Sequence, residues 1–265
     1  MRLDGKIAII TGAAGGMGEA AALLFAAEGA KVAAVDLRAE AVQPVVDKIR
    51  ADGGTAIAIG ADITRAGEVG ELAARTVAEL GLPTVLFNNA GVDLENKRAT
   101  IDIDEEAFDK TVEVNLKGTW LMMKYVVPYM IEAGGGSIVN NASAGAFVAV
   151  SSAGYCASKA GVVALTRVAA TELGRHNIRV NTLNPGMTWT PMAEHQRQEA
   201  LARGVTEQQM QATMRSMSVL GRMAQPIEMA RMALFLASDD SSFATGAAFM
   251  NDAGLSIMSA LQTGR

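Results

Sequence analysis

Short apolar runs alternate along this chain with longer stretches in which apolar residues recur at helical spacing. Strands buried on both faces of a parallel sheet are apolar throughout, and the helices between them cover the two faces. The apolar runs predict strands at 7–10, 31–35, 55–60, 85–88, 137–141, 179–183 and 247–251. The stretches between them predict helices at about 16–28, 39–52, 65–80, 104–133, 154–175 and 226–237. This is the pattern of an α/β protein with a doubly wound, parallel, seven-stranded sheet and helices on both faces.

One segment, residues 187–221, does not follow this alternation. It is rich in Met, Gln and Arg, and it is too long for a plain connection between a strand and a helix. Its Met and Trp residues are mixed with charges of both signs, which suits a pair of helices with one face over a pocket and the other in water. We therefore expect a substrate lid at about 188–220. Because no Pro/Ser-rich linker or repeat interrupts the chain, residues 1–265 are expected to form a single domain.

Composition limits the classes of partner. A net charge of −5 argues against nucleic acid or an anionic membrane, and no run approaches the ~18 apolar residues of a membrane span. The apolar run after the first six residues is too short for a signal peptide. Cys156 is the only cysteine, which excludes an internal disulfide and favours a reducing cytoplasm. With two histidines, no cysteine pair and no HExxH motif, we expect no dedicated transition-metal site.

A glycine-rich turn follows the first predicted strand and opens the first predicted helix. Residues 11–18 read Thr-Gly-Ala-Ala-Gly-Gly-Met-Gly. Glycines let the backbone approach a pyrophosphate closely, and the helix N-terminus supplies unpaired N–H groups and a positive dipole. The position of the turn between strand and helix predicts a dinucleotide site of the Rossmann type.

An acidic residue at the end of the second predicted strand indicates which dinucleotide binds. Asp36 follows Gly18 by 18 residues, where a carboxylate can accept hydrogen bonds from the adenosine ribose and would repel a 2′-phosphate. The turn contains no Lys or Arg that could pair with such a phosphate, although Arg38 lies close by in the sequence. The residues therefore favour NAD over NADP as the cofactor.

A tyrosine and a lysine four residues apart predict proton-transfer chemistry. Tyr155 and Lys159 would lie one above the other on a helix, and Ser143 precedes the tyrosine by 12 residues. A free phenol titrates near ~10, and a nearby positive charge favours its ionised form. Such a tyrosine can exchange a proton near neutral pH, as the reduction of a ketone or oxidation of an alcohol requires.

Together these motifs resemble the short-chain dehydrogenase/reductase family over nearly the whole chain. The matching positions are Thr11, Gly12, Gly16, Gly18, Asp62, Asn88-Asn89-Ala90-Gly91, Asn115, Ser143, Tyr155, Lys159, Pro185-Gly186 and Thr190. The resemblance implies cofactor contacts at Gly12, Gly16, Met17, Gly18, Asp36, Leu37, Asp62, Ile63, Asn89, Ala90, Gly91, Tyr155, Lys159, Pro185, Gly186, Thr188 and Thr190. It also implies a homotetramer, as do the apolar residues on more than one face of segments 116–131 and 161–173.

The family's catalytic residues match Asn115, Ser143, Tyr155 and Lys159. From the chemistry, Ser143 donates a hydrogen bond to the substrate oxygen, Tyr155 supplies the proton and Lys159 lowers the pKa of Tyr155; the resemblance adds that Lys159 holds the nicotinamide ribose. Asn115 is either a polar residue that bends an apolar helix or, as in the family, part of a proton relay to Lys159. Two features depart from the family pattern: the interval from Ser143 to Tyr155 is one residue shorter than is common, and the late D-G-G reads Asp252-Ala253-Gly254. We expect the first to trim the pocket wall and the second to affect local backbone packing.

The leading interpretation is an NAD-dependent dehydrogenase for a secondary alcohol, or for the matching ketone. The substrate residues are expected to be Ser143, Ala144, Phe147, Tyr155, Met187, Trp189 and Met192, with Leu94 and Val148 also near the pocket. The apolar members favour a compact hydrophobic or alicyclic small molecule. One alternative is a 3-oxoacyl-carrier-protein reductase, although the absence of Lys and Arg between Lys124 and Lys159 leaves no basic patch there for an acidic carrier. The other is a nucleotide-sensing protein, which would have no need of the serine, tyrosine and lysine.

Overall fold

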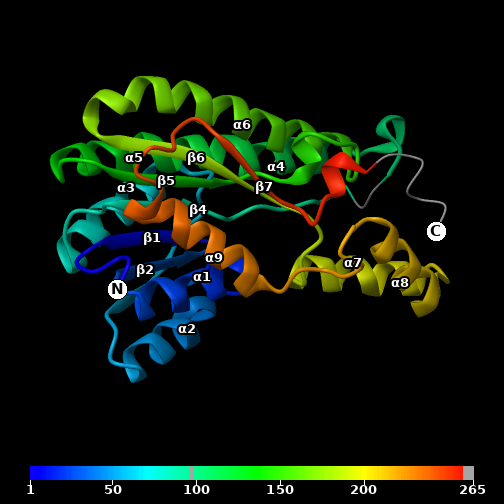
Figure 1. The fold of residues 1–265 in the computed structure, drawn as a ribbon, viewed down its shortest axis with the longest axis horizontal. Coiled ribbons are helices and arrows are strands. Elements are labelled where there is room, and N and C mark those ends of the chain that lie inside the picture. Colours follow the sequence, from blue (N-terminus) through cyan, green and yellow to red (C-terminus); the bar gives the residue numbers. More distant parts are fainter. Residues whose placement is uncertain (96–97, 259–265) are drawn as a thin grey trace.

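The structure is a computed structural model that describes residues 1–95 and 98–258. Within these ranges the strands form one parallel, seven-stranded sheet in the order β3-β2-β1-β4-β5-β6-β7 (Figure 1). The strands are β1 Ile7–Thr11, β2 Lys31–Asp36, β3 Ala56–Gly60, β4 Val85–Asn88, β5 Gly136–Asn141, β6 Ile178–Pro185 and β7 Ala248–Asn251. The predicted doubly wound sheet is confirmed, and the strand ends differ from the predicted ones by at most two residues.

The helices also begin and end close to their predicted limits, because recognisable end signals fix them. Asp104 accepts hydrogen bonds from the backbone N–H groups of Glu106 and Ala107 at the start of α4, and Pro226 opens α9. The helices are α1 Gly16–Ala27, α2 Ala39–Ala51, α3 Ala66–Leu80, α4 Glu105–Val112, α5 Thr119–Glu132, α6 Ala153–Leu173, α7 Pro191–Ala202, α8 Glu207–Ser216 and α9 Pro226–Ala237. In the described ranges, none of them is long and apolar enough to cross a membrane.

Alternate residues of each strand face opposite layers of helices. In β1, Ala8 and Ile10 belong to the core packed under α1, α2 and α9, whereas Ile7 and Ile9 belong to the core under α3, α5 and α6. Figure 1 shows α1, α2 and α9 on one side of the sheet and α5 and α6 on the other. Because the sheet is covered on both faces, most of its strands are apolar throughout, whereas β5 and β6 also carry buried polar residues.

The stretch predicted as one helix over 104–133 contains an irregular turn. Residues Glu113–Gly118, between α4 and α5, form a π-helical turn, so the prediction of one uniform helix is corrected. Such turns insert an extra residue into a helix and are frequent at functional sites. This one carries Asn115, whose side chain is fully buried and faces α6.

After β6 the chain leaves the sheet, forms α7 and α8, and returns beside its point of departure. Thr188 pairs with Ala224, and the flanking backbone hydrogen bonds, from Trp189 N to Ala224 O and from Ala224 N to Met187 O, are both 2.9 Å long. An ion pair between Arg197 of α7 and Glu207 of α8 joins the two helices. The segment predicted as a lid is therefore a helix pair closed at its base.

The alanine that replaces a family glycine near the C-terminal end adopts a backbone conformation that favours glycine. Ala253 has φ +52°, in the left-handed region. The preceding Asp252 holds this turn, because its carboxylate accepts hydrogen bonds from Gly254 N at 3.0 Å and Ser256 N at 2.7 Å. The carbonyl oxygen of Ala253 in turn accepts a hydrogen bond from Val219 N at the end of the lid segment.

Candidate active site

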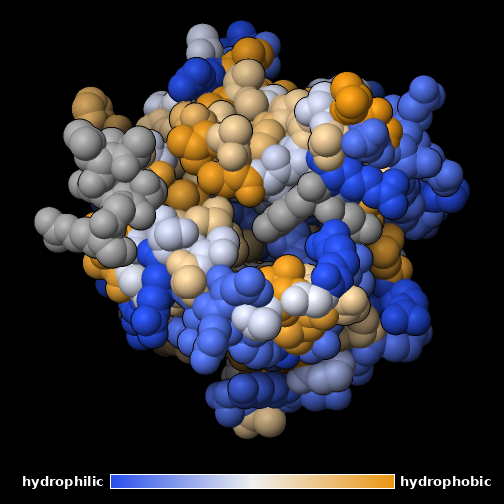
Figure 2. Space-filling view, turned by 90° about the vertical axis from the view of Figure 1, so that its right-hand side faces the viewer, coloured by the Kyte–Doolittle hydropathy of each residue, from blue (hydrophilic) through white to orange (hydrophobic). Residues whose placement is uncertain are grey.

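A cleft of about 680 Å³ opens at the carboxyl ends of the strands, beside β1 and β4. Strand order reverses between these two strands, and ligands of open α/β sheets bind at such a point. Figure 2 views this end of the molecule, where hydrophobic and hydrophilic side chains are mixed around a hollow. The predicted cofactor residues that line the cleft are Gly12, Gly16, Met17, Asp36, Leu37, Asp62, Ile63, Asn89, Ala90, Gly91, Tyr155, Lys159 and Thr190.

The remaining predicted cofactor residues lie close to the cleft without lining it. Gly18 is buried beneath the glycine turn, where a Cβ atom would lie 2.0 Å from the carbonyl oxygen of Gly12. Its role is therefore to let α1 pack closely against the turn. Pro185, Gly186 and Thr188 line a smaller cavity that adjoins the cleft at Tyr155 and Asn141.

The glycine turn fits a dinucleotide pyrophosphate. Gly12 and Gly16 have φ values of +66° and +56°, which non-glycine residues rarely adopt. Asn89 braces the turn by donating from its side-chain nitrogen to the carbonyl oxygens of Thr11 at 3.0 Å and Gly12 at 3.2 Å. Within the part of the chain that the structure describes, no side chain caps the N-terminus of α1, so its backbone N–H groups are available to an anion.

Asp36 is held at the end of β2 by the turn that it faces. Its carboxylate accepts hydrogen bonds from Ala14 N at 3.1 Å and Leu37 N at 2.8 Å. Among the described residues that line the cleft, only Lys110 and Lys159 carry a positive charge, and Lys110 is paired with Glu113 at 3.0 Å. Arg38 is exposed and does not line the cleft.

Tyr155 and Lys159 lie on the same face of α6, where the cleft and the smaller cavity meet. The Lys159 ammonium donates a hydrogen bond to the carbonyl oxygen of Asn141 at 2.8 Å and lies 5.7 Å from the centre of the Tyr155 ring. Lys159 is almost completely buried, and this burial lowers its pKa to about 8. At pH 7 the protonated form of Lys159 therefore still outnumbers the neutral form by about ten to one.

The pKa of Tyr155 corrects one expectation. Although part of the side chain is exposed, burial of its hydroxyl raises the pKa to about 12; a hydrogen bond with Ser143 lowers it, and the charge of Asp93 raises it further. Burial outweighs the hydrogen bond with Ser143, so the pKa lies above its ordinary value and not below it, and a lowering by the Lys159 charge stays a prediction. Tyr155 therefore holds its proton at neutral pH, as a proton donor must.

Asn115 links two parts of the site. Its side-chain oxygen accepts a hydrogen bond from Val92 N at 2.8 Å, and its nitrogen donates to Val92 O at 2.9 Å and to the Ser158 hydroxyl at 3.1 Å. Gly91 packs against it so closely that a Cβ atom would lie 3.1 Å from both Asn115 Oδ1 and Lys159 Nζ. Asn115 thus fixes the loop after β4 against α6, and a part in a proton relay stays a prediction.

Ser143 lies in a smaller cavity of about 130 Å³ that also contains Tyr155. The serine follows β5, and its hydroxyl oxygen accepts a hydrogen bond from Gly145 N at 3.0 Å. A cavity of ~150 Å³ can hold benzene, so this one has room for a single small ring or a short chain. Its lining includes four of the predicted substrate residues besides Tyr155, namely Ser143, Ala144, Met187 and Met192.

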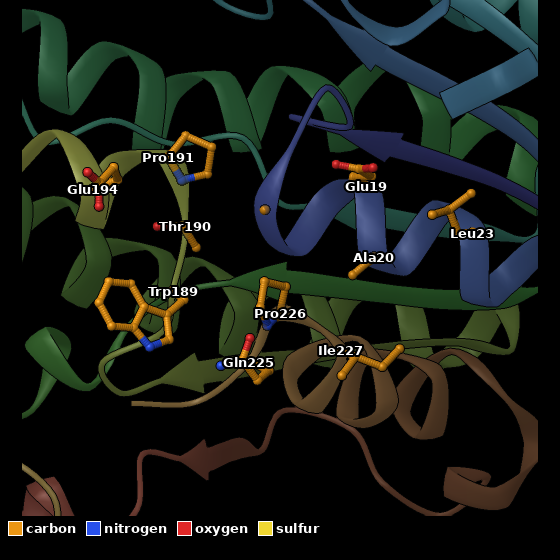
Figure 3. Close-up of a pocket in the computed structure, with 11 residues that line it drawn as sticks. Glu19, Ala20, Leu23, Trp189, Thr190, Pro191, Glu194, Gln225, Pro226 and Ile227 are labelled. Carbon is orange, nitrogen blue, oxygen red and sulfur yellow. The ribbon is translucent and has the colours of Figure 1, made fainter. Parts of the chain in front are cut away.

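Two predicted substrate residues lie outside this cavity. Trp189 borders a groove between α1 and α9, near Gln225 and Pro226 (Figure 3). Because Thr188 and Thr190 face the cavity from the extended segment, the residue between them points to the opposite side. Phe147 lines a separate depression together with Val148, because the chain has turned away from the cavity after Ala144. Leu94 lines the larger cleft.

Four polar residues of the cavity were missed by sequence reasoning: Asp93, Asn141, Ser151 and Gln196. Ser151 donates a hydrogen bond of 2.6 Å to Asp93, although 58 residues separate the two. No local spacing signals such a contact, and only the position of Asp93 two residues after the Asn-Asn-Ala-Gly stretch could have drawn attention to it. The cavity is therefore more polar than its predicted lining.

The arrangement suits binding of a nicotinamide dinucleotide beside a small substrate. The side-chain oxygen of Asn141 is buried without a hydrogen-bond partner among the described residues, and Asn141 lines both the cleft and the cavity. A ligand that reaches from one space to the other would pass beside Asn141. Tyr155 and Ser143 would then contact the substrate oxygen, while the turn and Asp36 hold the other end of the dinucleotide.

Comparison with known proteins gives consistent matches. A protein-family profile described as Enoyl-(Acyl carrier protein) reductase matches residues 12–256. The chain is 40% identical over 258 residues to 3-oxoacyl-(acyl-carrier-protein) reductase of Thermotoga maritima, covering 97% of this chain and 100% of the relative. It is 39% identical over 257 residues to D-threitol dehydrogenase of Mycolicibacterium smegmatis, covering 97% and 95% of the two chains. A crystal structure of a short-chain type dehydrogenase/reductase from Mycobacterium marinum has a TM-score of 0.88 and 34% identity, covering 97% of each chain.

Proposed function

Because the chain belongs to the short-chain dehydrogenase/reductase family, we propose that it is an NAD(H)-dependent oxidoreductase that interconverts a secondary alcohol and its ketone. The observation that carries the proposal is the meeting of Ser143, Tyr155 and Lys159 where the dinucleotide cleft joins a small cavity. When bound, the nicotinamide ring supplies or accepts the hydride. The cavity volume favours a compact substrate, in line with the alicyclic or hydrophobic class expected from its apolar residues.

The protein's own residues provide proton transfer and orientation. In the reducing direction Tyr155, protonated at neutral pH, donates its proton to the oxygen on which charge develops, and Ser143 donates a hydrogen bond to the same oxygen. Lys159 holds a positive charge beside this region and is itself anchored to Asn141. Asn115 and Gly91 keep the loop after β4 in contact with Lys159.

The proton-transfer role is tested by Tyr155→Phe, which removes the hydroxyl and keeps the ring. We expect the wild type to reduce NAD in the presence of a small secondary alcohol, followed at the NADH absorbance. The variant should lose about 10²–10⁴-fold in kcat while still binding NAD. Tyr129→Phe, a matched change on α5, should leave kcat unchanged. If Tyr155→Phe kept more than a tenth of wild-type kcat, the assigned role would be wrong.

The named relatives keep the carrier-protein alternative open. One of them is a 3-oxoacyl-(acyl-carrier-protein) reductase, while the other is named for D-threitol. However, Arg197, which lies on the helix α7 that lines the cavity, is paired with Glu194 and Glu207, so this arginine is not free to bind an acidic carrier. Higher kcat/KM for an acetoacetyl thioester with a reduced cofactor than for any small ketone would favour the alternative. A wild type that binds NAD but turns over no substrate would favour a nucleotide sensor.

We propose NAD as the preferred cofactor because Asp36 presents a carboxylate at the cleft. Asp36→Ala removes both the acceptor and the charge, so the ratio of kcat/KM for NAD to that for NADP should fall about tenfold or more, because hydrogen bonds to charged groups are strong. Asp36→Asn keeps the shape and should lower the ratio in the same direction. Arg38→Ala serves as the control and should leave the ratio unchanged. An unchanged ratio in both Asp36 variants would assign the preference to other residues.

We propose that the segment 188–220 closes over the nicotinamide end and the substrate. Helix α7 contains no fully buried residue, yet Met192, Ala193 and Gln196 on it line the cavity. A helix with such loose packing gains contacts when a ligand fills the space beneath it. Amide hydrogen exchange across 188–220 should therefore slow when NAD and a ketone analogue are added, while α3 serves as an unaffected reference. Equal exchange with and without ligands would identify the segment as fixed packing.

We propose a cytoplasmic homotetramer, as the family resemblance implies. Trp120 on α5 and Val168 on α6 are exposed, at 44% and 56%, although both are large and apolar. Contact between copies along these helices would bury such side chains. Sedimentation equilibrium at micromolar concentration should give a species of four times the 27.6 kDa chain mass. A monomer under these conditions would contradict the proposal.

A further inference from the structure

Asp93 is a charged residue in the substrate cavity for which the proposed hydride transfer has no role. It follows β4 and lines the same cavity as Ser143 and Tyr155. One carboxylate oxygen, Oδ2, accepts a hydrogen bond of 2.6 Å from the Ser151 hydroxyl. The other, Oδ1, is buried and has no hydrogen-bond partner among the described residues.

A buried carboxylate oxygen without a donor is costly in free energy. Such groups are rare in folded proteins, and those that occur need an explanation. Ser151 fixes the direction of the carboxylate, so Asp93 cannot easily turn Oδ1 toward another donor. In the oxidising direction the negative charge of Asp93 also opposes proton loss from Tyr155, because it raises the pKa of that residue. A local arrangement that is unfavourable until a ligand arrives is typical of a binding site.

We propose that Asp93 is a specificity-determining residue that accepts a hydrogen bond from a second hydroxyl group of the substrate. The preferred substrate is then a small diol, or in the reverse direction the matching hydroxyketone. This inference rests on the proposed function. The reacting hydroxyl contacts Ser143 and Tyr155, and the second hydroxyl satisfies Oδ1 of Asp93 on another wall of the same cavity.

The rest of the cavity favours a neutral hydroxyl over an ammonium group. Besides the polar residues, its walls are formed by apolar side chains, namely Met17, Val150, Met187, Met192 and Leu255. A substrate cation would lose its hydration against these walls with a single carboxylate as its partner, whereas a hydroxyl loses far less. The cavity of about 130 Å³ joins the larger cleft at Tyr155 and Asn141, so a small ring with a hydroxyl at each end would find apolar walls between two polar ends.

The test compares substrates that differ only in the second group. The probes are cyclohexanol, the isomers of cyclohexane-1,2-, 1,3- and 1,4-diol, and 2-aminocyclohexanol, each with NAD. Wild-type kcat/KM for the best diol should exceed that for cyclohexanol about tenfold or more, because the second hydroxyl pairs with a charged acceptor. A second readout is independent of turnover: in the presence of NADH, which cannot accept a hydride from an alcohol, the best diol should raise the melting temperature more than cyclohexanol does.

Asp93→Asn is the decisive variant because it keeps size and folding. Ser151 can still donate to the amide oxygen, so the amide nitrogen, a donor, would face the cavity in place of Oδ1. The ratio of kcat/KM for diol to cyclohexanol should then fall, and the protection by the diol should weaken, because the charged acceptor is lost. Asp109→Asn, a matched change on the exposed face of α4, should alter neither readout.

The outcomes separate this inference from the proposed function. Equal use of cyclohexanol and every diol, or an unchanged ratio in Asp93→Asn, would overturn the inference and leave the dehydrogenase proposal intact. A preference for the amino alcohol over the diols would overturn the assignment of a hydroxyl. If no alcohol were oxidised, the proposed function would fail, and the role of Asp93 would stand only if a diol raised the melting temperature of the wild type more than that of Asp93→Asn.

Discussion

A line of hydrogen bonds crosses the carboxyl edge of the sheet and joins the parts of the site. The Asn89 amide nitrogen donates to the carbonyl oxygen of Gly12, and its amide oxygen accepts from Asn141. The backbone oxygen of Asn141 accepts the Lys159 ammonium. These contacts tie β1 to β4, β5 and α6, so the glycine turn and the proton-transfer residues keep a fixed relation. An active site assembled from segments far apart in the sequence needs such cross-links, because precise placement of reacting groups supplies much of an enzyme's rate enhancement.

Burial shifts the pKa values of the two proton-transfer residues, Lys159 and Tyr155. It lowers the pKa of Lys159 to about 8 and raises that of Tyr155 to about 12, so both groups are protonated at neutral pH. The tyrosine can therefore donate its proton without first having to bind one. Proton removal from it, which alcohol oxidation requires, costs more in this setting and depends on the lysine charge and on what contacts Asp93. Ketone reduction therefore requires Tyr155 to give up a proton that it already holds, whereas alcohol oxidation requires a deprotonated Tyr155, which the same surroundings disfavour.

The sequence predicted the features that depend on local pattern. Apolar runs indicated most of the buried strands, the glycines indicated the turn, and the four-residue spacing placed Tyr155 and Lys159 on one face of α6. Features that depend on three-dimensional context were not predictable in this way. Helical periodicity does not reveal the one extra residue of the π-helical turn at Asn115. The outward direction of Trp189 follows from the pairing of Thr188 with Ala224, and the contact of Asp93 with Ser151 joins two loops.

The pairing of Thr188 with Ala224 at the base of the α7–α8 segment affects how this segment can change during evolution. Because Thr188 and Ala224 meet beside each other, the chain between them can change in length or sequence without altering the register of β6 against β7. The residues that move the proton come from α6 and the loop after β5, on the other side of that junction. Mutations in the segment 188–220 can therefore change which substrate is bound while the residues that transfer the proton stay the same. A scaffold organised in this way is well placed to diversify into many substrate preferences from one ancestral reaction.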